Sequence, residues 1–438
     1  MIKKLTFYTQ CAIIGFVVVI NIVVHAHKLR KIDRIFITYR GFAHTVIDTL
    51  AFLELHPKKG IVIIVGLIGD HYPSFTQRNK MFPLLLGNGK IISMTSRPYF
   101  LVNGAEGLWI WANIYEKTLK LFYLILRNKY TIISYNSRDT TKTPACNFIS
   151  SSLKISNDKA YKIFEDLEKQ LISSGNGHIM GHQLLFMKEW NLDFYSGVKK
   201  ADDIKFINDI LANFSVKPSV CFVIRNKLDL YSDISLSYYI EAIRFLCLRN
   251  FSVSLCGDTT NLLNLIKNKH KDLQASITNF CINSHKQKQL FELIVAAKCK
   301  FAVGDSGGFW SVLKIYNKPG LLINGQINNL IYNVEALPKR WIKSCNSVEV
   351  LNADLLFGAL FYKEFRYDLH NSHNSVFLQD VNEKGFILNA LVRYVDMENF
   401  AYPKKMEPKI LEKMPGNIWI KLAKDCSYSN DFLTKLEF

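Results

Sequence analysis

The stretch FAVGDSGGFWSVLKIYNKPGLLIN, from Phe301 to Asn324, decides the fold. It begins with a short apolar run, Phe301 to Val303, which is typical of a buried strand. A loop with three glycines follows, then a helical pattern over Gly308 to Tyr316 and a second apolar run over Gly320 to Ile323. A strand, a helix and a strand in this order predict a βαβ unit, and therefore a sheet with parallel strands.

The same alternation continues on both sides of this stretch. Further apolar runs predict strands over Arg34 to Tyr39, Gly60 to Gly66, Lys90 to Met94, Tyr130 to Ser134, Val220 to Ile224, Phe251 to Leu255 and Ile277 to Ile282. Helical patterns separate them, and together they predict an α/β protein with two Rossmann-like domains. We place the domain boundary near residue 216, which gives an N-terminal segment 1–30, domains 31–215 and 216–400, and a C-terminal tail 401–438.

Length and composition agree with two folded domains. The chain has 438 residues, of which 49% are hydrophobic and 21% charged, so it can bury substantial cores. A formal net charge of +18 favours an anionic partner, such as a phosphorylated substrate or an anionic membrane surface. The basic runs lack the interleaved aromatic residues of a nucleic-acid platform, so we expect no nucleic-acid partner. Nine scattered cysteines without zinc spacing favour a reducing compartment and no structural zinc site.

The N-terminal segment is strongly apolar. Residues Leu5 to Val24 carry no charge and are about as long as a helix that crosses a bilayer. Basic residues follow this segment more densely than they precede it, which predicts that the bulk of the chain lies on the cytoplasmic face of a membrane. We therefore expect a membrane anchor or interfacial helix. The alternatives are a signal peptide cleaved after Ala26, with export of the chain, and a helix buried in the core.

The first candidate site follows the first strand. Gly41 lets the backbone approach a ligand closely, and His44 places an imidazole at the start of the next helix. Ligands of open parallel sheets bind at this end of a strand. Asp48, one helical turn further on, would orient His44 or act as the base itself. The alternative is a tight turn in which His44 is only a polar residue at a helix start.

The second candidate site is Arg225 with Asn226, directly after the strand that ends at Ile224. A guanidinium at the end of a buried strand is costly unless it meets an anion, and its planar fork suits phosphate. The alternative is an ion pair with an acidic residue such as Asp258, just past the next strand.

The third candidate site is the glycine-rich loop after Val303. Ser306, Gly307 and Gly308 would present consecutive backbone N–H groups to a diphosphate, and Asp305 would hold the loop or meet a sugar hydroxyl. The loop is neither a Walker loop nor a GxGxxG dinucleotide motif. The alternative is a glycine-rich turn that only caps the next helix.

Two stretches around these sites resemble a known family. They are VCFVIRNKLDLYSDISLSYYIEAIRFLCLRNFSVSLCGD, Val220 to Asp258, and ELIVAAKCKFAVGDSGGFWSVLKIYNKPGLLIN, Glu292 to Asn324. They resemble the nucleotide-binding half of a bacterial glycosyltransferase family that is found near surface-polysaccharide genes and has the two-domain GT-B architecture. The loop Gly41 to His44 is similar to the N-terminal loop of that family.

This resemblance implies roles for single residues. Arg225, Ser306 and Gly307 would touch the diphosphate of a nucleotide. Asn324 would shape the donor pocket, and His44 would face the acceptor. The chain departs from the family at Ser232, where the family has an arginine, and at Ala43, where it has a glycine.

The expected function is sugar transfer from a nucleotide-diphosphate sugar to a membrane-associated glycan or lipid-linked acceptor, with no metal ion and no cofactor. Arg225 and backbone N–H groups would stabilise the departing diphosphate in place of a metal ion. The alternative is a non-catalytic nucleotide- or glycan-binding protein of the same fold, which Ser232 favours.

Overall fold

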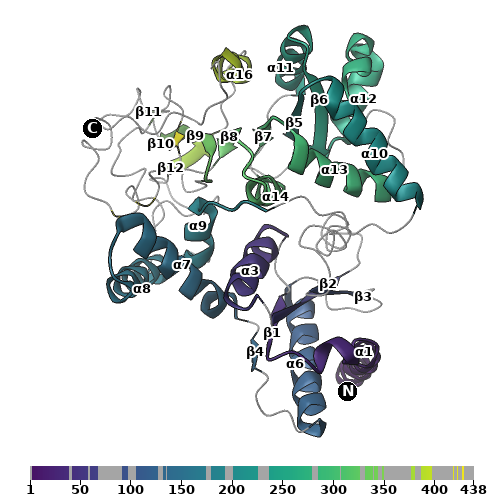
Figure 1. Ribbon diagram of the computed structural model, residues 1–438, viewed down its shortest axis with the longest axis vertical. Coiled ribbons are helices and arrows are strands. Elements are labelled where there is room, and N and C mark those ends of the chain that lie inside the picture. The colour runs from purple at the N-terminus through teal and green to yellow at the C-terminus, as the bar shows by residue number, and fades with distance from the viewer. Residues whose placement is uncertain are drawn as a thin grey trace. The chain divides into compact units, whose positions relative to one another are not determined.

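The computed structural model contains two compact units (Figure 1). Unit 1 comprises Met1–Pro144 and Tyr195–Val198, and unit 2 comprises Ala145–Phe194 and Lys199–Phe438. The structure describes residues 2–38, 42–57, 60–67, 91–96, 105–126, 132–134, 136–173, 179–192, 201–224, 236–278, 285–305, 307–325, 331–338, 340–343, 348–349, 376–379, 386–396, 418, 422 and 427–428.

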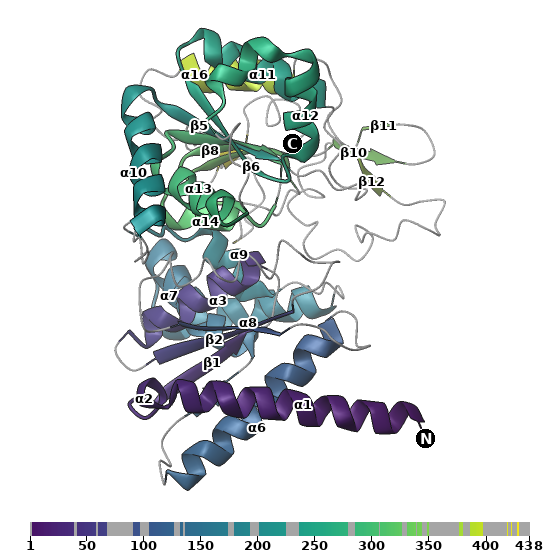
Figure 2. The same ribbon diagram turned by 90° about the vertical axis from the view of Figure 1, so that its right-hand side faces the viewer.

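Unit 1 is built on a parallel sheet with the strand order β3-β2-β1-β4. The strands are β1 (Arg34–Thr38), β2 (Gly60–Leu67), β3 (Ile91–Ser96) and β4 (Ile132–Ser134). The helices are α1 (Ile2–Val24), α2 (Ala26–Leu29), α3 (Phe42–Leu55) and α6 (Ala105–Ile125). Figure 2 shows α3 on one face of this sheet and α1 with α6 on the other.

The side chains of β1 alternate between the two faces of the sheet and so contribute to both layers of unit 1. Ile35 and Ile37 belong to the cluster that packs against α1 and α6. Phe36 points to the other face and stacks on Phe52 of α3, with ring centroids 5.6 Å apart. The period of two residues along a strand therefore supplies apolar side chains to both faces.

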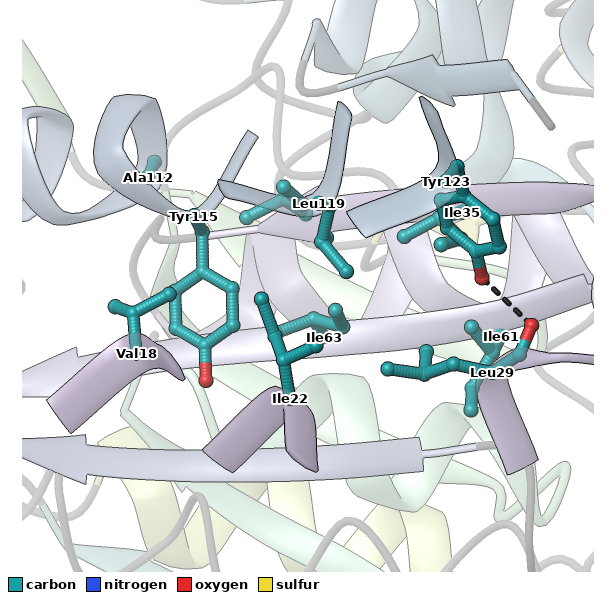
Figure 3. Packing of buried hydrophobic residues seen from close by; sticks show 11 residues of the cluster. Val18, Ile22, Leu29, Ile35, Ile61, Ile63, Ala112, Tyr115, Leu119 and Tyr123 are labelled. Carbon is teal, nitrogen blue, oxygen red and sulfur yellow. Dashed lines mark hydrogen bonds between the residues drawn. The ribbon is translucent and has the colours of Figure 1, made fainter. Parts of the chain in front are cut away.

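The layer of α1 and α6 has a well-defined core (Figure 3). Its buried members are Val18, Ile22, Leu29, Ile35, Ile37, Ile61, Ile63, Ala112, Tyr115, Leu119 and Tyr123. The Tyr115 hydroxyl donates a hydrogen bond to Asn21 Oδ1 at 2.7 Å, and the Tyr123 hydroxyl donates one to the Leu29 carbonyl oxygen at 2.7 Å. One face of α1 is thus part of the core of unit 1.

Unit 2 contains a second sheet, with the order β13-β9-β8-β7-β5-β6 and parallel pairing throughout. The strands are β5 (Ser219–Ile224), β6 (Ser252–Gly257), β7 (Phe301–Asp305), β8 (Gly320–Gly325), β9 (Val334–Pro338) and β13 (Ser427–Tyr428). Ile277 adds an isolated parallel bridge to Val253 on the outer side of β6. With this bridge, the chain order across the sheet is that of a Rossmann fold.

The helices of unit 2 cover both faces of its sheet. Figure 2 shows α11 and α16 on one face and α13 and α14 on the other. Helix α7 (Ser137–Leu153) begins in unit 1 and ends in unit 2. The helices that follow it are α8 (Asn157–Ser173), α9 (Met180–Met187), α10 (Ala201–Val216), α11 (Leu236–Leu248), α12 (Thr260–Lys269), α13 (His285–Lys298), α14 (Trp310–Ile315) and α16 (Phe386–Asp396). A small antiparallel sheet consists of β10 (Arg340–Lys343), β11 (Val348–Glu349) and β12 (Val376–Gln379).

The α/β prediction with parallel sheets is confirmed, but the chain divides at other points than residue 216. Residues 145–194, which we expected in the first domain, belong to unit 2. Their end is tied to that unit because the Lys314 ammonium donates hydrogen bonds to the carbonyl oxygens of Phe186 and Lys188. Such contacts join residues far apart in sequence, and no local sequence pattern predicts them.

The N-terminal segment forms α1, and the expected anchor finds no support as a spanning helix. Among the described residues, no helix combines the length and the apolar character that crossing a membrane requires. The alternative of a core helix holds for the face of α1 that carries Val18 and Ile22.

Candidate functional site

Each parallel sheet has a point at which the strand order reverses. In unit 2 this point lies between β5 and β7, and in unit 1 it lies between β1 and β4. Loops that leave the carboxyl ends of two such strands run to opposite faces of the sheet, and ligands of open α/β sheets bind there. All three predicted sites follow one of these strands, with His44 after β1, Arg225 after β5 and Asp305 at the end of β7.

Two glycines allow the strands of unit 2 to approach each other at this edge. Gly304 has a φ of +149°, and a Cβ added there would lie 2.1 Å from the carbonyl oxygen of Val223. Gly257 has a φ of +92°, and its Cβ would lie 2.3 Å from the carbonyl oxygen of Ile224. Any other residue would force the ends of β6 and β7 away from β5.

Asp305 fixes the start of the glycine-rich loop. Its side chain is buried, and its Oδ2 accepts a hydrogen bond from the Tyr239 hydroxyl at 2.7 Å. Its carbonyl oxygen accepts a second one from Trp310 Nε1 at 2.8 Å. The two aromatic donors come from α11 and α14, so Asp305 connects the strand end to both helices. This contact corresponds to the loop-holding role that we considered, and a sugar contact for Asp305 stays a prediction.

Residues Gly307 to Ser311 form a tight turn, and the space beside Gly307 is free. Ser311 Oγ donates a hydrogen bond to the Gly308 carbonyl oxygen at 2.6 Å, and the Trp310 N–H bonds to the Gly307 carbonyl oxygen at 3.2 Å. A Cβ added at Gly307 would meet no atom within 4 Å. Hydrogen bonds therefore hold the residues on both sides of the loop, while Gly307 is partly exposed with free space beside it, as an anion-binding loop requires.

The end of β6 is also fixed, by two residues that were not among the predicted site residues. Glu292 of α13 is buried, and its Oε1 accepts a hydrogen bond from the Gly257 N–H at 2.9 Å. One turn earlier, the Lys288 ammonium donates to the Gly257 carbonyl oxygen at 3.0 Å. The two charged side chains thus hydrogen-bond the N–H and the carbonyl group of Gly257, a residue with a positive φ. A carboxylate inside the apolar run LFELIVAA was the signal that could have found Glu292.

In unit 1 the corresponding edge contains a buried carboxylate. Asp48 of α3 is fully buried, and its Oδ2 accepts a hydrogen bond from Ser137 Oγ at 2.7 Å. Ser137 begins α7, so the carboxylate lies at a helix N-terminus, where the helix dipole favours negative charge. His44 is half-buried in the first turn of α3. Complete burial of Asp48 favours an orienting or structural role over direct contact with an acceptor.

Several predicted site residues lie outside the described part of the chain. These are Gly41, Arg225, Asn226 and Ser306, whose roles stay predictions. Asn324 lies in β8, but its side chain is outside the description. Within the residues described, no three His, Cys, Asp or Glu side chains are grouped to hold a metal ion.

The comparisons with known proteins find no matching family model and no matching curated protein. Solved structures show weak similarity. Escherichia coli ADP-heptose lipopolysaccharide heptosyltransferase II is 11% identical, with 70% of this chain and 90% of that one covered and a TM-score of 0.37. The glycosyl transferase family 9 protein from Veillonella parvula is 10% identical (70% and 85% covered, TM-score 0.39). UDP-GlcNAc 2-epimerase from Methanocaldococcus jannaschii is 12% identical (66% and 84% covered, TM-score 0.31). These values are low, so the function proposed for the chain rests on its own residues.

Proposed function

We propose that the chain is a glycosyltransferase that uses a nucleotide-diphosphate sugar. Unit 2 would bind the donor and unit 1 the acceptor, as in the GT-B architecture that the sequence resembles. The observation that carries this proposal is the loop Asp305 to Gly308, which is held at both ends and open at Gly307, at the switch point of a Rossmann-type sheet. A loop that is held at its ends and has free space at a glycine suits a diphosphate, which would accept hydrogen bonds from the backbone N–H groups.

The proposed reaction assigns a role to each of these residues. His44 would take the proton of an acceptor hydroxyl while that oxygen forms a bond to the anomeric carbon of the donor. The bond from this carbon to the diphosphate breaks, and the nucleoside diphosphate leaves with the electron pair. Arg225 and the N–H groups of the loop would stabilise the negative charge on the departing diphosphate, with no metal ion.

The acceptor and the location belong to the same proposal. A glycan or lipid-linked acceptor at the cytoplasmic face of a membrane agrees with the apolar α1 and the net charge of +18.

A screen of nucleoside diphosphates by thermal unfolding tests the donor site. A nucleotide at a hundred times its Kd should stabilise the protein by about 2.7 kcal/mol. If no nucleoside diphosphate raises the unfolding temperature, the proposed donor site is wrong. Turnover is then measured as release of nucleoside diphosphate from nucleotide sugars with a membrane extract, with and without EDTA. An unchanged rate with EDTA supports metal independence.

The rival function is non-catalytic binding of a nucleotide or glycan, and Ser232 favours it because the resembled family has an arginine there. The same experiment separates the two functions. A protein that binds the nucleotide but releases none from any nucleotide sugar, with or without acceptor extract, is the non-catalytic binder. Restoring the family residue with Ser232→Arg then shows whether this position is the cause.

A further inference from the structure

From Cys11 to Val24, helix α1 is apolar except for Asn21, but only one side of this stretch is buried. The covered side carries Val18 and Ile22, which are 0% and 3% exposed and pack beside Tyr115 (Figure 3). The opposite side, which we call the outer face, carries Ile13, Phe16, Val17, Ile20, Val23 and Val24. Phe16 is 69% exposed and Val23 is 64% exposed. A helix that is hydrophobic all round is normally buried all round, and an exposed apolar face of this kind is typical of an interaction surface.

Specific hydrogen bonds hold α1 and α2 against α6 within unit 1. The Tyr115 hydroxyl donates a hydrogen bond to Asn21 Oδ1 of α1, and the Tyr123 hydroxyl donates one to the carbonyl oxygen of Leu29, the last residue of α2. Asn21 is the polar residue within the apolar half of α1, and it lies at the side that meets α6. These hydrogen bonds fix which side of α1 faces α6. Asn21 is used on that side, so the outer face carries only apolar side chains.

The charges around α1 indicate what covers its outer face. Residues 2–24 contain no aspartate or glutamate. Lys3 and Lys4 lie at one end of the helix, and Lys28, Arg30 and Lys31 follow the other end. Arg30 and Lys31 are exposed. Two copies of such a surface would bring positive ends together, whereas anionic lipid headgroups would neutralise them and acyl chains would cover the apolar face.

The end of α6 extends the apolar surface near these basic residues. Leu124 and Ile125 are 69% and 71% exposed, and their neighbour Tyr123 is hydrogen-bonded to the backbone beside Arg30. We propose that the outer face of α1, together with the end of α6, docks on an anionic bilayer, with α1 lying along the lipid surface. This inference adds a docking surface to the proposed function, and its test needs neither donor nor acceptor.

Flotation of the full chain with lipid vesicles tests the proposal. The wild-type protein should float with vesicles of phosphatidylcholine and phosphatidylglycerol. The variant Phe16→Ser with Val23→Ser should bind at least about tenfold more weakly, because it loses apolar area that the bilayer buries. The matched control is Leu248→Ser with Val216→Ser, which changes two exposed apolar residues of unit 2 and should float like the wild type.

The contribution of charge is tested with the same vesicles. The variant Arg30→Gln with Lys31→Gln should lose about fivefold in binding for each charge on anionic vesicles and should not change on pure phosphatidylcholine. Thermal unfolding checks that all variants remain folded. Equal flotation of the Phe16 variant and the wild type would overturn the proposal. So would a wild-type chain that ignores vesicles but forms a dimer that Phe16→Ser dissociates.

Discussion

Tyr239 is the residue whose role in the donor site can be tested most cleanly. It is buried and donates to a buried carboxylate, Asp305, so Tyr239→Phe should lower the free energy of unfolding by about 1 to 3 kcal/mol. It should also weaken nucleotide binding, because the loop loses one of its fixed points. The control is Tyr123→Phe, which removes an equally short hydrogen bond in unit 1. Calorimetric titration should show weaker nucleotide binding for Tyr239→Phe only. Equal nucleotide affinity in both variants would make Tyr239 purely structural.

The proposed general base of unit 1, His44, can also be tested with single substitutions. His44→Ala should lower turnover by about 10² to 10⁴ fold with unchanged nucleotide affinity, because proton abstraction matters only in the transition state. Asp48→Asn should cost less, and the double variant should be no worse than His44→Ala alone. Ser137→Ala removes the hydrogen-bond donor of Asp48 and separates orientation from stability. Near-native turnover in both single variants would make the loop a simple turn.

At the scale of elements, the glycines at the carboxyl edge of the second sheet make a matched pair. Gly304→Ala places a Cβ against the Val223 carbonyl oxygen at a φ that L-residues avoid, so it should destabilise unit 2 by about 3 kcal/mol or more. Gly307→Ala meets open space and should leave the unfolding temperature nearly unchanged while it weakens nucleotide binding. Urea unfolding and calorimetric titration measure the two effects. A Gly307→Ala variant with wild-type affinity would contradict the assignment of the loop to the donor.

Helix α1 shows why its deletion is a poor test of membrane binding. The sequence alone suggests that residues 1–27 can be removed without harm, since the first strand begins at Arg34. The structure buries Val18 and Ile22 against Tyr115, so the truncation exposes apolar side chains of the core of unit 1 to solvent. Substitutions on the outer face of α1 avoid this loss.

The elements also show how far the sequence could predict the structure. The end of β5 at Ile224 was predicted correctly and the end of β1 to within one residue, because apolar runs that stop abruptly mark them. Strand β7 extends to Asp305, two residues past the predicted end at Val303, because the predicted loop residues Gly304 and Asp305 still pair with β8. The partners Ser137 and Tyr239 lie 89 and 66 residues away from the carboxylates they hold, and nothing in their local sequence marks them. Helix α7 was missed because it contains Pro144 and has no apolar stripe.

At the scale of the whole molecule, nucleotide binding should stabilise unit 2 and leave the stability of unit 1 unchanged. Cys221, Cys256 and Cys299 are buried in unit 2, and burial raises the pKa of Cys221 and raises that of Cys299 to about 12. Such thiols react with alkylating reagents only after unfolding. A bound nucleoside diphosphate should therefore slow alkylation of these cysteines about a hundredfold at a hundred times its Kd, while Cys11 of unit 1 reacts at its former rate. Mass spectrometry of the labelled peptides measures each site. Equal protection of Cys11 would mean that the nucleotide also stabilises unit 1.

The central claim is that unit 2 holds the diphosphate of a nucleotide sugar at the switch point between β5 and β7. Calorimetric titration of the nucleoside diphosphate into wild-type protein and Arg225→Ala tests it most directly, with Arg249→Ala, at the end of α11, as the control. We expect Arg225→Ala to weaken binding by about 1.5 to 3 kcal/mol, the range for a hydrogen bond to a charged group, without a change in unfolding temperature. Arg249→Ala should bind like the wild type. Equal affinities of all three proteins, or no binding by the wild type, would contradict the account.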